Sequence, residues 1–195
     1  DVLPFKSFDS IGNVKLRGLH NLKNCAFVYV ISKSFGVSDE QFIYLLQSFQ
    51  PLKHRMEFIG VKHGVEYYDD SISTTVESTI NAIKSINNVE TVILGGMDRG
   101  IDYTHLISFL LNSKIKNILL MYESGKRLYE LFKKEADCHD KIIVYCSDLE
   151  QAAQTAQEVT SKGAACLLSP ASASYGHFRN FEERGDTFKQ LLFNK

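Results

Sequence analysis

Residues 91–121 read TVILGGMDRGIDYTHLISFLLNSKIKNILLM, and the pattern in this stretch indicates the fold class. Its two ends, Thr91–Leu94 and Ile115–Met121, are short runs of apolar and β-branched residues, which is typical of strands buried on both faces. The apolar side chains between them follow the spacing of one face of a helix. A strand, a helix and a strand in this order predict two parallel strands joined by a helical crossover.

The same alternation continues along the chain on both sides of this unit. Lys141–Tyr145 and Ala164–Leu168 read as further buried strands, and Glu57–Val61 and Val65–Asp69 read as a hairpin. Amphipathic stretches separate the strands, and a final helix is expected to carry Phe178, Phe181, Phe188 and Leu192. The sequence therefore predicts an α/β fold: an open, mostly parallel Rossmann-like sheet of about six strands, with a β-hairpin at its start and helices on both faces.

The pattern changes near Pro51. Before it lie a short extended segment at residues 13–16 and two helical patterns, one from about His20 to Ser34 and one opened by the capping box Ser38-x-x-Gln41. About fifty residues with so little structure bury too little surface to stand alone. We expect residues 1–51 to be part of a second α/β domain and residues 52–195 to form the main domain.

Composition excludes several classes of protein. Of the 195 residues, 44% are hydrophobic and 23% charged, and 22 Lys and Arg against 23 Asp and Glu leave a net charge of -1. This balance is that of a globular protein without general attraction to nucleic acid or anionic lipid. No apolar run approaches the ~18 residues of a membrane span. We expect a cytoplasmic protein with neither a nucleic-acid nor a membrane partner.

Cysteine and histidine spacing gives no metal site. The four cysteines never form CxxC and the six histidines form neither HxH nor HExxH, so a zinc site and a disulfide scaffold are both disfavoured. The cysteines are Cys25, Cys138, Cys146 and Cys166.

Four segments follow predicted strand ends, where ligands bind in sheets of this kind, and three of them are candidate sites. DDSISTT at residues 69–75 offers hydroxyls and N–H groups to an anion, although Thr74-x-x-Glu77 is also a good capping box. GGMDRG at residues 95–100 carries Arg99, which would clamp a carboxylate or phosphate or would simply be a solvated turn residue. LSPASAS at residues 168–174 is a run of small residues that would let a ligand approach the backbone, or would serve packing alone.

Other polar residues are weaker candidates. His54-Arg55 lies at the domain boundary, where it would reach a ligand between domains or act as a linker charge. Asn21 and Asn24 lie near a helix start, where capping explains one Asn but not both. Ser124-Gly125-Lys126 reads as an ordinary helix start without a further role. There is no GxxxxGK[ST] motif, so the residues alone indicate an α/β domain with an anion-binding cleft, attached to a larger partner.

Taken together, these segments resemble the Mur ligase family, and within it the members that add D-glutamate. The resemblance covers essentially the whole chain and lies in five motifs: Leu16-x-Gly18-x-His20-Asn21-x-x-Asn24; His54-Arg55-Met56-Glu57; Asp70-Ser71 followed by Thr74; Gly95-Gly96-x-Asp98-Arg99; and LSPASASYGHFRNFEERG at residues 168–185, the most specific of them.

The resemblance implies an ATP-dependent ligase of bacterial peptidoglycan synthesis. Such an enzyme joins D-glutamate to UDP-N-acetylmuramoyl-L-alanine through an acyl phosphate, with Mg²⁺ neutralising the anions. It implies that residues 1–51 are the C-terminal remnant of a central ATP-binding domain and that residues 52–195 are the amino-acid-binding C-terminal domain. The cell compartment implied is the bacterial cytoplasm, and the expected state is a monomer.

The resemblance also assigns residues. Asn21, Asn24, Arg55 and Asp70 would contact ATP, with Asp70 on the ribose and Arg55 on a phosphate. D-Glutamate would be held by Thr74, Arg99, Ser174 and the backbone of Phe181.

No catalytic residue and no metal ligand is expected within the chain. The family's P-loop, magnesium ligands, carbamylated lysine and UDP-binding domain would precede Asp1, and the chain by itself is expected not to catalyse ligation.

Three positions depart from the family pattern: Ile72 and Arg99 stand where lysine is common, and Gly176 is expected to weaken the cap of the last helix. Two alternatives stay open, a stand-alone amino-acid-binding module and the C-terminal domain of another Mur-type or folylpolyglutamate-type ligase.

Overall fold

The computed structural model describes residues 2–16, 18–135 and 140–193, and the chain folds as two compact units, Asp1–Leu52 and Lys53–Lys195. The first unit holds a 3₁₀ turn, η1 (Phe8–Ser10), and two helices, α1 (Leu19–Ser34) and α2 (Asp39–Ser48). No strand is found among its described residues, so the segment at residues 13–16 pairs with nothing in a sheet.

A small apolar core joins the two helices of the first unit, and Phe8, Cys25, Phe42 and Leu46 are buried in it. The predicted capping box at the start of α2 is confirmed. The Ser38 hydroxyl accepts the Gln41 N–H at 3.2 Å, and the Gln41 side chain accepts the Ser38 N–H at 2.9 Å.

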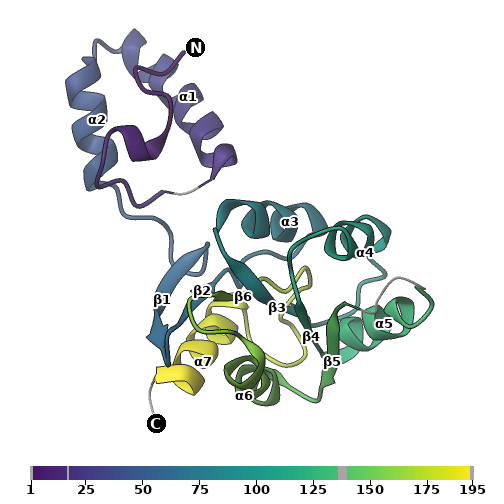
Figure 1. Ribbon diagram of the computed structural model, residues 1–195. Helices are drawn as coiled ribbons and strands as arrows, with labels where there is room; N and C mark the ends of the chain where they lie inside the picture. The colour runs from purple at the N-terminus through teal and green to yellow at the C-terminus, as the bar shows by residue number, and fades with distance from the viewer. Residues whose placement is uncertain (1, 17, 136–139, 194–195) are drawn as a thin grey trace. The chain divides into compact units, whose positions relative to one another are not determined.

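The second unit is built on a six-stranded sheet in the order β1-β2-β6-β3-β4-β5, shown in Figure 1. β1 pairs antiparallel with β2 and all other neighbours are parallel, so the predicted fold class is confirmed. The strands are β1 (Glu57–Lys62), β2 (Val65–Asp69), β3 (Val89–Gly95), β4 (Asn117–Met121), β5 (Ile142–Cys146) and β6 (Ala165–Leu168).

Helices cover both faces of this sheet (Figure 1). On one face, α3 (Val76–Ser85), α4 (Thr104–Leu111) and α5 (Tyr122–Phe132) share a core with Val92 and Leu94 of β3. On the other face, α6 (Leu149–Val159) and α7 (Phe181–Phe193) share a second core with Ile93. Successive residues of a strand point to opposite faces, which is why Val92, Ile93 and Leu94 of β3 are all apolar.

Two helix starts differ from the sequence prediction. α3 is capped by Thr75 with Ser78, one residue later than the predicted Thr74, because adjacent polar residues fit the capping pattern equally well and the backbone decides which is extended. α7 begins only at Phe181, so Phe178 precedes it. The Asn180 side chain accepts the Glu183 N–H at 2.9 Å, so Gly176 does not weaken this cap.

The strand order places a topological switch between β6 and β3. From β3 the chain runs into α4 on one face, whereas from β6 it runs into α7 on the other. Ligands bind at such a switch, outside the carboxyl ends of the strands. The ends of β2, β6 and β3 therefore frame the candidate site.

None of the described helices is both long enough and apolar enough to span a bilayer.

We predict that Gly95→Ala destabilises the second unit by about 3 kcal/mol, because Gly95 has φ 118° and an added Cβ would collide with the carbonyl oxygen of Met121. Gly163→Ala is the matched control: its φ is 83°, but nothing lies within 4 Å of the added carbon, so a loss of about 1 kcal/mol is expected. Urea denaturation measures both, and equal losses would contradict the packing argument.

Candidate functional site

Three loops meet at the carboxyl edge of the sheet and are joined by backbone hydrogen bonds. The Asp70 N–H, after β2, donates to the Leu168 carbonyl at 2.8 Å. After β3, the Gly95 N–H donates to the Pro170 carbonyl at 2.8 Å and the Met97 N–H to the Ala173 carbonyl at 2.9 Å. The small residues of the 168–174 loop allow these close approaches.

A buried arginine from α7 braces two of these loops. Arg184 is fully buried, and its Nε and Nη2 donate to the hydroxyl and carbonyl of Ser71 at 2.9 and 2.7 Å. Its Nη1 donates to the Ser172 carbonyl at 3.1 Å. The Ser71 hydroxyl donates in turn to the Phe181 carbonyl at 2.8 Å. Burial lowers the pKa of Arg184 to about 10, so the guanidinium stays charged at neutral pH.

The first turn of α5 holds the loop after β3. The Ser124 hydroxyl accepts the Gly96 N–H at 2.9 Å and is 2.8 Å from the Ser172 hydroxyl. A Cβ on Gly96 would meet the Ala173 carbonyl oxygen and the Arg184 guanidinium. The segment at residues 124–126, read as an ordinary helix start, therefore does carry a positioning contact, which the sequence pattern could not reveal.

A buried His–Asp pair lies behind the loop after β2. His54 Nδ1 is 2.7 Å from Asp69 Oδ2, and Asp69 Oδ1 accepts the Ser71 N–H at 2.9 Å. A Cβ on Gly185 would collide with both side chains, so α7 can approach only because this position is glycine.

His54, Glu57 and Asp69 have the geometry of a metal cluster among the described residues. However, the Lys189 ammonium lies 2.9 Å from Glu57 Oε2 and 3.5 Å from Asp69 Oδ2. An ammonium in this place already neutralises the carboxylates and repels a cation. The cluster is therefore an ion-pair network that fastens α7 to the hairpin, and it does not fit a divalent metal.

Asp70 lies inside the domain. It is 1% exposed, and its two carboxylate oxygens accept the Met56 N–H at 3.1 Å and the Ser169 hydroxyl at 2.7 Å. Burial raises the pKa of Asp70 to about 6. The contact of Asp70 with the ribose of ATP stays a prediction. The two hydrogen bonds give the side chain a structural role whether or not it binds ATP.

The residues predicted to hold D-glutamate lie on the loops that frame this edge, Thr74 after β2, Arg99 after β3, and Ser174 and Phe181 after β6. Arg99 is exposed, and no residue of the described chain bonds or ion-pairs with its guanidinium. Its neighbour Asp98 is not free, because Arg127 binds it through two bonds of 2.8 and 2.9 Å.

Ser174 is 4% exposed, and its hydroxyl has no hydrogen-bond partner in the part of the chain that the structure describes. Every fully buried side-chain oxygen or nitrogen of the described residues has a partner, so this hydroxyl must still reach solvent. Phe181 is the first residue of α7, where the N–H has no acceptor within the helix.

The residues predicted to contact ATP belong to both units. Asn21 and Asn24 are the third and sixth residues of α1, three apart and so on one helix face, and the N-cap of α1 is Gly18. Neither Asn is therefore the N-cap residue of this helix. Arg55, in the second unit, is exposed and without a partner among the described residues.

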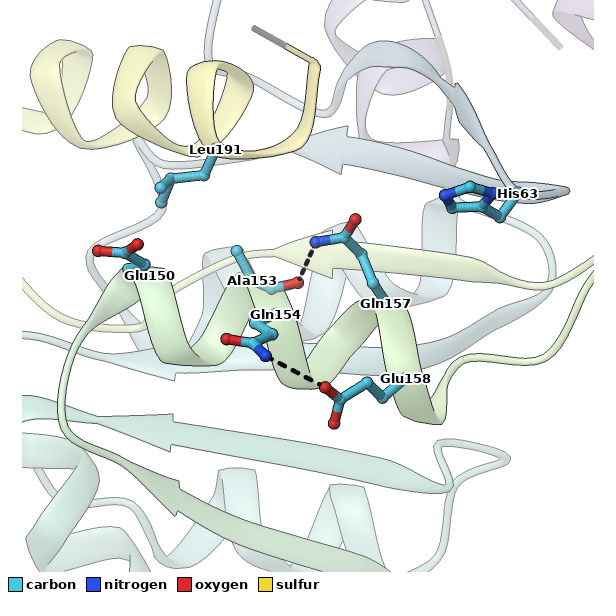
Figure 2. A pocket seen from close by; sticks show the side chains of 7 residues that line it. All are labelled: His63, Glu150, Ala153, Gln154, Gln157, Glu158 and Leu191. Carbon is cyan, nitrogen blue, oxygen red and sulfur yellow. Dashed lines mark hydrogen bonds between the residues drawn. The ribbon is translucent and has the colours of Figure 1, made fainter. Parts of the chain in front are cut away.

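A surface groove of about 350 Å³ lies elsewhere in the second unit, over α6 (Figure 2). None of the candidate residues lines it. The lining residues are His63, Glu150, Ala153, Gln154, Gln157, Glu158 and Leu191.

The buried residues that shape the site were not predicted from the sequence. A signal for Arg184 was present: it stands between Phe181 and Phe188 at helical spacing, so a charge lies on the buried face of the last helix. Nothing in the pattern marked Asp69 or His54 as a pair.

Comparison with known proteins identifies the domain. Residues 54–172 match the family described as Mur ligase, glutamate ligase domain. UDP-N-acetylmuramoylalanine--D-glutamate ligase of Aquifex aeolicus is 36% identical over 92% of this chain and 42% of its own length. The protein of the same name from Elusimicrobium minutum is 34% identical over 98% of the chain and 41% of its own length. The chain thus spans about two fifths of these relatives.

Solved structures share the fold at low identity. UDP-N-acetylmuramate-alanine ligase of Thermotoga maritima has a TM-score of 0.65 at 17% identity, covering 90% of this chain and 38% of its own. Folylpolyglutamate synthase of Mycobacterium tuberculosis has a TM-score of 0.65 at 8% identity, covering 90% and 41%.

We expect Arg184→Met to lower the free energy of unfolding by about 3 kcal/mol, because it leaves the buried acceptors of Ser71 and Ser172 without their donor. Arg179→Met is the control: its side chain is 85% exposed and pairs only with Glu183 on the surface, so a change within about 0.5 kcal/mol is expected. Similar losses in the two variants, measured by chemical denaturation, would show that Arg184 is not a brace.

The pKa of Asp70 predicts a pH dependence of stability. Its folded pKa of about 6 lies above the ordinary value of about 3.9, so between these values the folded chain holds a proton that the unfolded chain has lost. The contribution to stability is therefore full below about pH 4 and is lost as the pH rises to about 6. The difference in unfolding free energy between wild type and Asp70→Asn should fall by on the order of 2 kcal/mol over this range; a difference independent of pH would refute the assignment.

Proposed function

The chain belongs to the Mur ligase family, and on this basis we propose that it binds D-glutamate and part of ATP for a ligase acting on UDP-N-acetylmuramoyl-L-alanine. The second unit would be the amino-acid-binding domain, and the first unit would contribute to the ATP site. The names of the relatives support the choice of D-glutamate, because their sequences match nearly all of this chain.

The observation that carries the proposal is the Arg99 guanidinium at the same sheet edge as the Ser174 hydroxyl, both without a partner among the described residues. By contrast, Asp98, Ser169 and Arg184 at this edge are hydrogen-bonded within the domain. D-Glutamate has two carboxylates, which suit a cation with hydroxyl and backbone N–H donors. We propose that Thr74 and the N–H of Phe181 complete this set.

The chemistry needs an amine held against an activated acyl group. The terminal phosphoryl group of ATP would pass to the carboxylate of the nucleotide precursor, and ADP would be the leaving group. The neutral amine of D-glutamate would then attack the acyl carbon, so that the C–N bond forms, the C–O bond to phosphate breaks, phosphate leaves and the nitrogen releases its surplus proton to solvent. This chain would hold D-glutamate so that its amine points at that carbon. It would therefore contribute to the reaction by positioning the substrate and not by transferring a proton.

Among the residues proposed to contact ATP, Arg55 lies between two neighbours that are held by hydrogen bonds. His54 accepts the Ile72 N–H at 3.1 Å through its carbonyl, and the Met56 N–H donates to Asp70 at 3.1 Å. Both neighbours are thus fixed to the exit of β2, while the guanidinium between them is exposed. An exposed guanidinium on a backbone held in this way suits a contact with a phosphate. We also propose that Asp70 contacts the ribose of ATP. This contact requires Asp70 to lose one of its present hydrogen bonds, to the Met56 N–H or to the Ser169 hydroxyl.

Mg²⁺ would accompany ATP, but the described residues do not provide its ligands. Their one candidate cluster already contains the Lys189 ammonium. No described residue of this chain is therefore proposed as a ligand of the metal. Ligation by the chain alone is not expected, since the sequence has no GxxxxGK[ST] motif to hold the phosphates.

The first unit favours a ligase over a stand-alone binding module. Its helices expose many large apolar side chains, with Phe27 71%, Ile31 59% and Tyr44 70% exposed. Surfaces of this kind are usually covered by protein. The low-identity structures establish only the fold, so the choice of D-glutamate over the substrates of other ligases rests on the sequence relatives and on the residues named above.

In the full-length gene product, Arg99→Ala should raise the KM for D-glutamate about ten- to a hundredfold, because a charged hydrogen bond to a carboxylate is lost. The assay follows ATP-dependent joining of D-glutamate to UDP-N-acetylmuramoyl-L-alanine, with L-glutamate as the competing substrate. Lys114→Ala is the control, since Lys114 is exposed beside the opposite edge of the sheet.

Arg55→Ala gives the complementary pattern in the same assay. We expect the KM for ATP to rise while the KM for D-glutamate stays within about twofold, since a phosphate contact is removed and the amino-acid site is left intact. A wild-type enzyme that ignores D-glutamate, or an Arg99→Ala enzyme with unchanged KM, would refute the assignment of this site.

A further inference from the structure

The loop that carries Ser174 is held unequally at its two ends. Its near end is fixed by the Ala173 carbonyl, which accepts the Met97 N–H, and by the Ser172 carbonyl, which accepts from Arg184. Beyond Ser174, Tyr175 is 60% exposed, and an added Cβ on Gly176 would meet nothing within 4 Å. Something else must fix the far end if the Ser174 hydroxyl is to keep its place.

The far end lies on the first turn of α5. The His177 ring stacks on the Tyr122 ring with centroids 3.7 Å apart and planes at 19°. Phe178 meets the same ring edge-on at 6.1 Å. His177 Nε2 is 2.8 Å from Glu123 Oε2, and this bond lowers the pKa of Glu123. Two successive residues of the loop thus contact two successive residues of the helix.

Tyr122 is itself held rigidly. Its φ is 61°, a left-handed conformation that a bulky residue rarely adopts and that persists only where the surroundings fix it. Its hydroxyl accepts the N–H of Leu149, the first residue of α6, at 3.1 Å. The ring is therefore fixed at the backbone and at the hydroxyl, and it offers a firm face to His177.

The contact is transmitted directly to Ser174. Its carbonyl accepts the N–H of Phe178 at 3.0 Å and that of His177 at 3.4 Å. The turn from Ser174 to Phe178 is therefore closed by the same two residues that rest on Tyr122. If His177 moves, the Ser174 carbonyl loses its donors and the hydroxyl loses its orientation.

We propose that His177 is a positioning residue for amino-acid binding, which fastens the Ser174 turn to Tyr122 and Glu123 of α5. The proposal rests on the function proposed above, because it assumes that Ser174 contacts D-glutamate. His177 touches no substrate; it acts through the turn. Stacking on Tyr122 and the hydrogen bond to Glu123 are separate contributions, and they can be removed separately.

The test combines a structural and a kinetic measurement. In the chain itself, His177→Ala should lower the protection of the amides at positions 177 and 178 against hydrogen exchange about tenfold. In the full-length gene product it should raise the KM for D-glutamate about three- to tenfold, with kcat and the KM for ATP within about twofold, as loss of one aromatic contact and one exposed hydrogen bond predicts.

Two conservative variants separate the contributions. His177→Phe keeps the stacking and should retain most of the amide protection, while carboxyl NMR should show the pKa of Glu123 rising toward its ordinary value. Glu123→Gln removes only the charge and should match His177→Phe in KM. His105→Ala is the control, because His105 is exposed on α4 and has no partner among the described residues.

The outcomes are distinguishable. Unchanged amide protection in His177→Ala overturns the fastening, and reduced protection with an unchanged KM for D-glutamate overturns the positioning role. A wild-type enzyme without D-glutamate dependence overturns the proposed function, and with it the link from this turn to D-glutamate, whatever the exchange data show.

Discussion

The candidate site depends on one buried guanidinium. Arg184 reaches from α7, on one face of the sheet, to the loops that leave β2 and β6. A buried charge is tolerated only where hydrogen bonds replace water, and here all its observed acceptors belong to the loops that frame the site. The cost of burying the charge therefore enforces a single arrangement of these loops. Gly96 follows from the same constraint, since an added Cβ would collide with the Ala173 carbonyl oxygen and the Arg184 guanidinium.

At the candidate site, the residues that hold the loops in place differ from the residues whose donors are available to a ligand. Asp69, Asp70, Asp98 and Ser169 bind partners within the domain, so they hold the loops but offer little to a ligand. Within the part of the chain that the structure describes, Arg99 and Ser174 keep donors without a partner at the edge of this framework. Donors fixed before a ligand arrives bind it with a smaller loss of conformational entropy, which is the general reason for building a binding site on loops that are braced from behind.

Local signals in the sequence were reliable where a single residue type or a simple period sets the outcome. The apolar run at residues 91–94 is a strand buried on both faces, as its composition predicts, and the hairpin turn at His63-Gly64 needs two residues with positive φ, here 54° and 82°. Capping positions were less certain. In Ser73-Thr74-Thr75 three neighbouring hydroxyls are available, and the one that caps α3 is Thr75, whose backbone is extended. The role of Ser124 was invisible because its partners, Gly96 and Ser172, lie 28 and 48 residues away.

The class of fold, its strands and helices and the loops in which a ligand would be sought can all be read from the order of the amino acids, because they follow from periodicity and from the chemistry of adjacent residues. The family can be read in the same way, through motifs that extend over most of the chain. Which polar residues are free and which are already bonded becomes known only from the folded chain. That distinction depends on contacts between segments far apart in the chain, such as Arg184 with Ser71 and His177 with Glu123, and no local pattern encodes the distance between them.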